Sequence, residues 1–374
     1  MAKRAMEIEG GAPRATGGAL SAGIDRYFKA HAQLRPNTLA SYKSATDKLL
    51  EWAAANGVKS GDDLTRAKLL GFREEIIAEP KRAAAKKAKR GARRATAARR
   101  SAYSVNRELR GIRVVLGYLA ELDLLTKIHE GDLRRALKKL PVSVERTEYL
   151  KPPELQATLK SALEHDVEMH AATRAELAGL RPVGTTPRFE PVAPFLVTVL
   201  LSGMRLGEAI DLKWDQVDVD ALDNDGKVVG EIHLTGSTKT KRARSIGLEV
   251  SPALRELLAA LKKAGTGTGK VFPITHDGAA AAAKRLKAEY GAPSAFGWQA
   301  LRRTCGTFLT NSPGIFGSAS AYRSAKQLGH SVAVAEKYYV GIERGIQRDA
   351  RDLESAMQIK PQLDRVIDAV GSRA

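Results

Sequence analysis

The chain has 374 residues, a length typical of two or three domains, and 43% of them are hydrophobic, which is enough for buried cores. Lysine and arginine total 61 against 42 acidic residues, which gives a formal net charge of +19 and a sequence pI near 9.9. This surplus favours a polyanionic partner, with nucleic acid ahead of an anionic membrane surface.

The cysteine content and the lack of targeting signals further limit the classes of protein to which the chain can belong. The single cysteine, Cys305, excludes a disulfide within the chain and a cysteine-rich metal site, and we expect it to be a buried small residue. Residues 1–19 lack the apolar core of a signal peptide. The longest apolar run, 192–201, contains Pro194 and is too short to span a membrane. We therefore expect a cytoplasmic, nucleoid-associated protein that does not bind membranes.

The first third of the sequence predicts a small helical domain over residues 19–126, preceded by a flexible tail at 1–18. Apolar residues at three-and-four spacing predict a helix over 21–33 and a second that follows a break at 35–38 and ends at Gly57. A third helix is expected from Thr65 and a fourth over 104–122. Residues 127–150 are charged and aperiodic, and we interpret them as a linker.

A basic run separates the third and fourth predicted helices. Residues 81–100 contain ten lysines or arginines and no carboxylate. A solvated, self-repelling loop would have this composition, but the charge of the whole chain favours contact with DNA phosphates, which supplies affinity with little sequence information. The DNA-contacting side chains predicted here are Lys81, Arg82, Lys86, Lys87, Lys89, Arg90, Arg93 and Arg94.

The second part, residues 151–350, predicts a mostly helical domain with a small β-sheet. A helix starts at the prolines of 150–155, a loop covers 178–191, and a buried helical segment covers 195–201. Two strands over 228–234 and 241–248 flank a turn, and Arg242 and Arg244 of this hairpin are further candidates for DNA contact. Helices follow at 251–263 and 279–290. Residues 351–374 have helical spacing, and either docking on a neighbouring protomer or packing on their own domain fits this pattern.

Three short stretches carry groups that can grip and attack a phosphodiester. Arg205 stands at a helix start in Ser202-Gly203-Met204-Arg205-Leu206-Gly207-Glu208, and Arg302 lies in Trp298-Gln299-Ala300-Leu301-Arg302. His330 follows Leu328-Gly329, and Tyr338 and Tyr339 come shortly afterwards. Arginine offers a planar donor fork that matches phosphate oxygens, and tyrosine can act as a covalent nucleophile. A glycine–histidine pair that ends a helix is also an ordinary C-cap.

These stretches, in this order, resemble the tyrosine recombinase (phage integrase) family over roughly residues 20–350. The resemblance implies a helical core-binding domain joined to a mainly α catalytic domain with a small sheet. It also implies that Arg205, Lys239, Arg302 and His330 are catalytic, with Lys241 as the alternative lysine. The family's spacing favours Tyr339 as nucleophile over Tyr338. Gln299 occupies the position of the family's histidine, and glutamine cannot take a proton from tyrosine.

The resemblance further implies site-specific DNA recombination through a 3′-phosphotyrosine intermediate, which needs neither metal nor cofactor. Double-stranded DNA would be the partner, with a homotetramer on paired sites and accessory DNA-bending or directionality proteins. Two alternatives remain at this point: strand cleavage like that of a type IB topoisomerase, and a DNA-binding regulator without catalysis.

Overall fold

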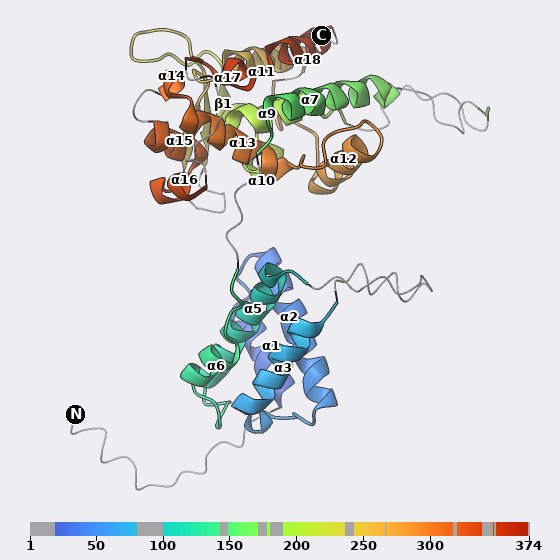
Figure 1. The fold of residues 1–374 in the computed structure, drawn as a ribbon, viewed down its shortest axis with the longest axis vertical. Coiled ribbons are helices and arrows are strands. Elements are labelled where there is room, and N and C mark those ends of the chain that lie inside the picture. Colours follow the sequence, from blue (N-terminus) through green and yellow to red (C-terminus); the bar gives the residue numbers. More distant parts are fainter. Residues whose placement is uncertain are drawn as a thin grey trace. The chain divides into compact units, whose positions relative to one another are not determined.

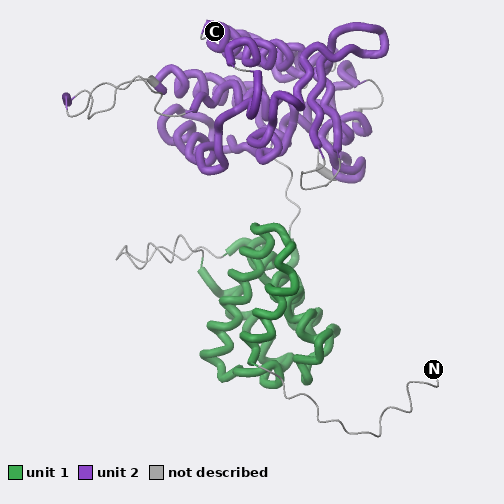
Figure 2. Tube along the Cα trace, turned by 180° about the vertical axis from the view of Figure 1, so that it is seen from behind, with its two compact units in different colours: residues 1–144 green, residues 145–374 purple. Residues whose placement is uncertain are grey.

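In the computed structural model, the chain forms two compact units, residues 1–144 and 145–374 (Figure 2). Each unit is built around its own hydrophobic core. The structure describes residues 19–80, 100–142, 149–170, 178–179, 190–235, 243–265, 267–316, 320–338, 347 and 349–372, excluding the side chains at 170, 320, 337 and 338.

The first unit is helical throughout its described part, as expected (Figure 1). Helix α2 begins at Pro36, inside the expected break, because the first position of a helix needs no N–H donor. Thr65 caps α3 by accepting a hydrogen bond from the Lys68 amide at 3.3 Å. Helices α2 and α5 pack together, and α1 also packs on α5. The helices are α1 Leu20–Ala30, α2 Pro36–Ala55, α3 Arg66–Ala78 and α5 Ala102–Glu121, with a 3-10 turn at Gly61–Asp63.

A further short helix, α6 (Glu130–Ala136), lies in the stretch 127–150 that we interpreted as a linker. It packs against α3 and α5, and Leu133 and Ala136 are fully buried in the core of the first unit. The sequence did not predict α6, because seven helical residues are too few to establish a hydrophobic period. The domain boundaries remain a prediction, although this segment belongs to the first core.

Helix α9 (Ala193–Ser202) is the centre of the second unit. All ten of its residues are buried, which fits a helix that is apolar on every side. Pro194 lies in the first turn, where it is tolerated, and the Asp166 carboxylate accepts the amides of Val192 and Ala193 at 2.8 Å each. Helices α7, α11, α13 and α18 pack around α9. Their bounds are Pro152–Val167, Pro252–Ala264, Trp298–Asn311 and Lys360–Gly371.

The small sheet is antiparallel in the order β1-β2-β3. The two expected strands are present but shorter, and β1 was not predicted because it has only two residues. Ile232 pairs with Ile246, and both are fully buried. His233 and Ser245, the next pair along the strands, are exposed, so the alternation of a half-buried sheet is kept. The strands are β1 Val217–Asp218, β2 Glu231–Leu234 and β3 Arg244–Gly247.

The C-terminal segment packs on its own unit. The Leu353 amide donates to the Val250 carbonyl at 2.9 Å, and the Glu354 carboxylate accepts the Ala253 amide at 2.9 Å, at the start of α11. Helix α18 lies against α7, α9 and α11. Of the two arrangements considered for residues 351–374, the structure therefore has the intramolecular one. The remaining helices are α10 Leu206–Ile210, α12 His276–Ala288, α14 Pro313–Phe316, α15 Ser320–Leu328, α16 Val332–Tyr338 and α17 Leu353–Met357.

Candidate active site

A tight turn between α9 and α10 presents Arg205. Gly203 ends α9 with φ +62°, the left-handed region that favours glycine. A Cβ at this position would lie 2.3 Å from Leu328 Cδ2 and 3.0 Å from Cys305 Sγ. Glycine is therefore required both by conformation and by the close approach of α13 and α15. Two residues later Arg205 is the N-cap of α10, with 27% of its side chain exposed.

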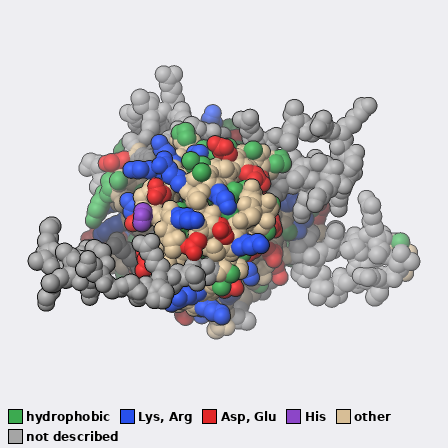
Figure 3. All heavy atoms as spheres, turned by 90° about the horizontal axis from the view of Figure 1, so that it is seen from below, with side chains coloured by type: hydrophobic (Ala, Val, Ile, Leu, Met, Phe, Trp, Pro, Cys, Tyr) green, Lys and Arg blue, Asp and Glu red, His purple; other side chains and the backbone are tan. Residues whose placement is uncertain are grey.

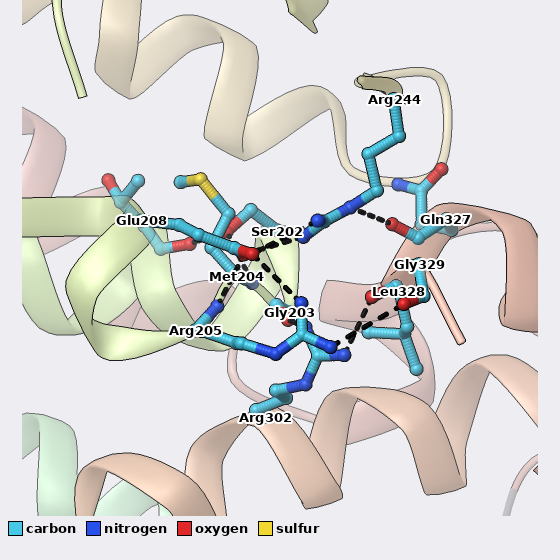
Figure 4. A network of polar contacts seen from close by, with 11 residues as sticks. Ser202, Gly203, Met204, Arg205, Glu208, Arg244, Arg302, Gln327, Leu328 and Gly329 are labelled. Carbon is cyan, nitrogen blue, oxygen red and sulfur yellow. Dashed lines mark hydrogen bonds and ion pairs between the residues drawn. The ribbon is translucent and has the colours of Figure 1, made fainter. Parts of the chain in front are cut away.

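Arg302 of α13 reaches the same turn from below the surface. It is only 4% exposed, and its guanidinium donates to the Gly203 carbonyl through Nη1 and to the Leu328 carbonyl through Nη2, both at 2.6 Å. Arg205 Nη2 lies 3.5 Å from the next carbonyl along, that of Gly329. The two arginines, 97 positions apart by their numbering, thus converge on one turn (Figure 4).

Glu208 lies between Arg205 and a third arginine, Arg244. Its side chain is 5% exposed, and it forms ion pairs with Arg205 at 2.9 Å and with Arg244 at 2.6 Å. Burial raises the pKa of this carboxyl, but the hydrogen bond and charge of Arg244 outweigh it. Together with contacts from Arg205, they lower the pKa to about 2. Glu208 is therefore ionised at neutral pH despite its burial.

His330 is placed by the way α15 ends. Gly329 has φ +68°, and the His330 amide donates to the Ala325 carbonyl at 3.1 Å, the six-to-one bond of a Schellman cap. The glycine–histidine pair is therefore a helix cap, and the same cap places His330 beside the arginines. Burial lowers the pKa of His330, and the charges of Arg302, Arg205 and Arg244 lower it further. Its imidazole is neutral at pH 7.

The tautomer of His330 follows from its contact with Ser331. Nδ1 lies 3.0 Å from the Ser331 carbonyl oxygen, and a carbonyl oxygen can only accept a hydrogen bond. Nδ1 therefore carries the proton in the neutral ring, and Nε2 is the acceptor.

Cys305 lies beneath the site rather than in it. It is fully buried, and its thiol contacts the Leu201 carbonyl at 3.7 Å. Burial raises the pKa of the thiol to about 12, although the charge of Arg302 acts in the opposite direction. The expectation of a buried, small packing residue is confirmed.

An open cleft of about 620 Å³ adjoins Arg205. It is bordered by α10, by Lys213 and Lys270 and by Thr235, where the described part of the hairpin ends. The isolated bridge between Lys213 and Lys270 places these two lysines opposite each other. The cleft makes Arg205 accessible from solvent, and its lining also includes the carboxylates of Glu208, Asp211 and Asp215.

The other predicted residues divide into three groups. Gln299 is exposed in the first turn of α13, three positions before Arg302 and so on the same side of the helix. The backbone of Tyr338 ends α16. Several candidates lie outside the described residues: Lys239, Lys241, Arg242, Tyr339 and the basic-run residues Lys81, Arg82, Lys86, Lys87, Lys89, Arg90, Arg93 and Arg94.

Arg244 departs from its expected role as a DNA contact. Only 9% of its side chain is exposed, and both Nη atoms donate to the Glu208 carboxylate at 3.1 and 2.6 Å. Basic composition alone predicted an exposed arginine, but the buried carboxylate draws it inward. Sequence reasoning also missed Glu208. An acidic residue three positions after the start of a helix is the signature of a capping box, and this signal could have found it.

Charge on the described surface is mixed. The face in Figure 3 carries lysine and arginine side chains interspersed with aspartate and glutamate. In the part of the chain that the structure describes, no group of three His, Cys, Asp or Glu side chains is placed to hold a metal ion. Among these residues, no helix is long and apolar enough to cross a membrane.

Comparison with known proteins finds similarity in structure rather than in sequence. No protein-family model and no curated protein matches the chain. A lambda integrase dimer bound to a COC' core site matches with a TM-score of 0.55 at 16% identity, covering 90% of this chain and 99% of that one. The Tn1549 transposon integrase with a circular intermediate DNA gives a TM-score of 0.52 at 14% identity, covering 87% and 96%.

A third solved structure, the XerH site-specific recombinase bound to its difH substrate in a pre-cleavage complex, gives a TM-score of 0.51 at 14% identity. It covers 87% of this chain and 81% of that one. The chain therefore shares the fold of these three proteins, a helical fold with a small antiparallel sheet, as its sequence motifs predicted.

Proposed function

We propose that this protein is a site-specific DNA recombinase that cuts and rejoins strands through a 3′-phosphotyrosine intermediate. One observation carries the proposal. Arg205, Arg302 and His330 come from three distant segments, and all three lie at the turn Leu328–Gly329 or directly after it. A stable helical fold alone does not need two arginines and a histidine there.

The arginines would supply the electrostatic part of catalysis. About a thousandth of a phenol with a pKa near 10 is ionised at pH 7, so attack on a phosphodiester needs strong stabilisation of the transition state. Arg205 and Arg302 would bind the non-bridging oxygens and offset the charge that develops there. Their positions are set in advance by carbonyl and carboxylate contacts, so little reorganisation would be needed during the reaction.

His330 would take over the proton transfer that Gln299 cannot perform. Neutral His330 is held by the Ser331 carbonyl with Nε2 as the acceptor, which is the orientation of a general base. We assign it the phenolic proton of the nucleophile. A phosphate bound to the arginines would offset the positive charges that now disfavour the imidazolium.

The remaining roles follow the family resemblance. Tyr339 would attack the phosphorus and form the 3′-phosphotyrosine bond, while the bond to the 5′-oxygen breaks. Lys239 would donate a proton to that leaving oxygen. The energy of the phosphodiester is kept in the covalent link, so rejoining needs no nucleotide cofactor. Strand exchange would take place between two duplexes held by four protomers.

A nicked suicide substrate tests the proposal. The DNA would carry candidate sites taken from the sequence that flanks the gene, and the nick would let the cleaved end diffuse away. We expect a covalent protein–DNA adduct on a denaturing gel, with the modified peptide containing Tyr339. An adduct on Tyr338 keeps the function and moves the nucleophile by one residue.

Two results would redirect the proposal. Tight binding without any adduct would favour a DNA-binding regulator, and Gln299→His would then be the first substitution to make. Relaxation of a supercoiled plasmid that lacks a recombination site would favour a topoisomerase.

A further inference from the structure

The contacts of Glu208 are shared equally between two arginines. Oε1 accepts from Arg205 Nη1 at 2.9 Å and from Arg244 Nη1 at 3.1 Å. Oε2 accepts from the Arg205 amide at 2.9 Å and from Arg244 Nη2 at 2.6 Å. The three side chains form one hydrogen-bonded triad, in which Arg205 is the more exposed arginine and Arg244 the more buried one.

The charge of this triad matters for phosphate binding. A carboxylate that only oriented Arg205 would also cancel its positive charge, and so weaken its attraction for a phosphate. The second guanidinium of Arg244 offsets the carboxylate, so the triad as a whole keeps one positive charge. Glu208 can then fix the direction of Arg205 without that loss.

Arg244 is itself fixed by contacts with β3 and with the end of α15. It begins β3, and its Nε donates to the Gln327 carbonyl at 3.3 Å. The Gln327 side chain donates in return to the Gly247 carbonyl of β3 at 3.0 Å. A Cβ on Gly329 would lie 2.6 Å from Arg244 Cδ, so glycine makes room for the arginine stem. Strand β3 and the end of α15 together hold the guanidinium against Glu208 (Figure 4).

We infer that Arg244 is a positioning residue that offsets the charge of Glu208, so that Glu208 orients Arg205 while Arg205 keeps its attraction for the scissile phosphate. The inference rests on the proposed function, since it deepens the role of Arg205 in that reaction. It also gives a reason for an arginine whose side chain is only 9% exposed.

A charge role makes a prediction that a packing role does not. Arg244→Gln leaves Glu208 paired with Arg205 alone, and we expect single-turnover cleavage at saturating DNA to slow by about a hundredfold, the scale for one preorganised charge stabiliser. Adding Glu208→Gln removes the uncompensated carboxylate, and we expect the double variant to recover at least about tenfold of the loss. Arg244→Lys keeps the charge without the fork and should stay within about tenfold of the native rate.

The test uses the full chain and the nicked substrate described above. Arg365→Gln, which removes an exposed arginine of α18, is the matched control and should cleave at the native rate. Thermal unfolding and DNA affinity of each variant separate loss of fold from loss of rate. If Arg244→Gln does not fold, the cleavage rate of Arg244→Lys is compared with those of the native chain and the double variant. This comparison still distinguishes a charge role for Arg244 from a packing role.

The outcomes are distinct. Recovery in the double variant supports the inference. A double variant as slow as Arg244→Gln or slower, or Arg244→Lys as slow as Arg244→Gln, overturns it in favour of packing. If the native chain itself forms no adduct, the proposed function fails, and that failure is seen before any variant is compared.

Discussion

Glu208→Gln should change how the stability of the second unit depends on pH. The carboxyl has its pKa lowered from 4.5 to about 2 in the folded chain. A depressed pKa adds stability that is fully present above the unfolded value and is lost as the pH falls toward the folded one. A difference of about 2.5 pH units corresponds to roughly 3 kcal/mol. Of this, about 1.4 kcal/mol should be lost by about pH 3.5.

The comparison needs a probe that reports the second unit alone. Trp52 lies in the first core, whereas Trp214 and Trp298 lie in the second, so both chains would carry Trp52→Phe. Urea unfolding followed by tryptophan fluorescence then gives the free energy of unfolding at about pH 6 and about pH 3.5.

At the higher pH the native chain should exceed Glu208→Gln by about 3 kcal/mol, because the variant leaves the buried Arg244 and the partly buried Arg205 without their carboxylate. The gap should narrow by about 1.4 kcal/mol at the lower pH, since only the native chain loses the contribution of Glu208. A gap that does not change with pH would refute the ion-pair account of this residue.

Three further expectations follow. Gly203→Ala should lower the free energy of unfolding by at least about 2 kcal/mol, because φ is positive and the new Cβ would clash with α15. The control Gly291→Ala has a similar φ but open space around its Cβ, so it should lower the free energy of unfolding by about 1 kcal/mol. Equal losses in the two variants would contradict the clash. The thiol of Cys305, whose pKa is raised to about 12, should react with iodoacetamide only after unfolding, so rapid labelling of the native chain would show that it is accessible. Tyr339→Phe should bind DNA normally and form no covalent adduct, and a normal adduct yield would remove Tyr339 from the reaction.

Local sequence patterns were sufficient to predict those elements whose secondary structure and burial depend on one short segment. The helix expected over 104–122 is α5, and its Leu109, Ile112, Leu116 and Leu119 are buried at helical spacing, because helical periodicity is a local property. The uniformly apolar run of α9 predicted burial for the same reason. The two-residue strand β1 and the short helix α6 were missed, since each is stabilised by partners from elsewhere rather than by its own pattern.

By itself the sequence determined the fold class. It also predicted catalytic roles for Arg205, Arg302 and His330 from their local contexts, and these roles stay predictions. Only the tertiary structure decided how these side chains are used. It turned Arg244 inward onto Glu208 and set the tautomer of His330 through Ser331. Both depend on contacts between segments far apart in the chain, and on burial that strengthens each charge interaction. Composition and spacing do not predict such long-range contacts. The basic composition of the hairpin therefore indicated an exposed Arg244, whereas Arg244 is buried in the fold.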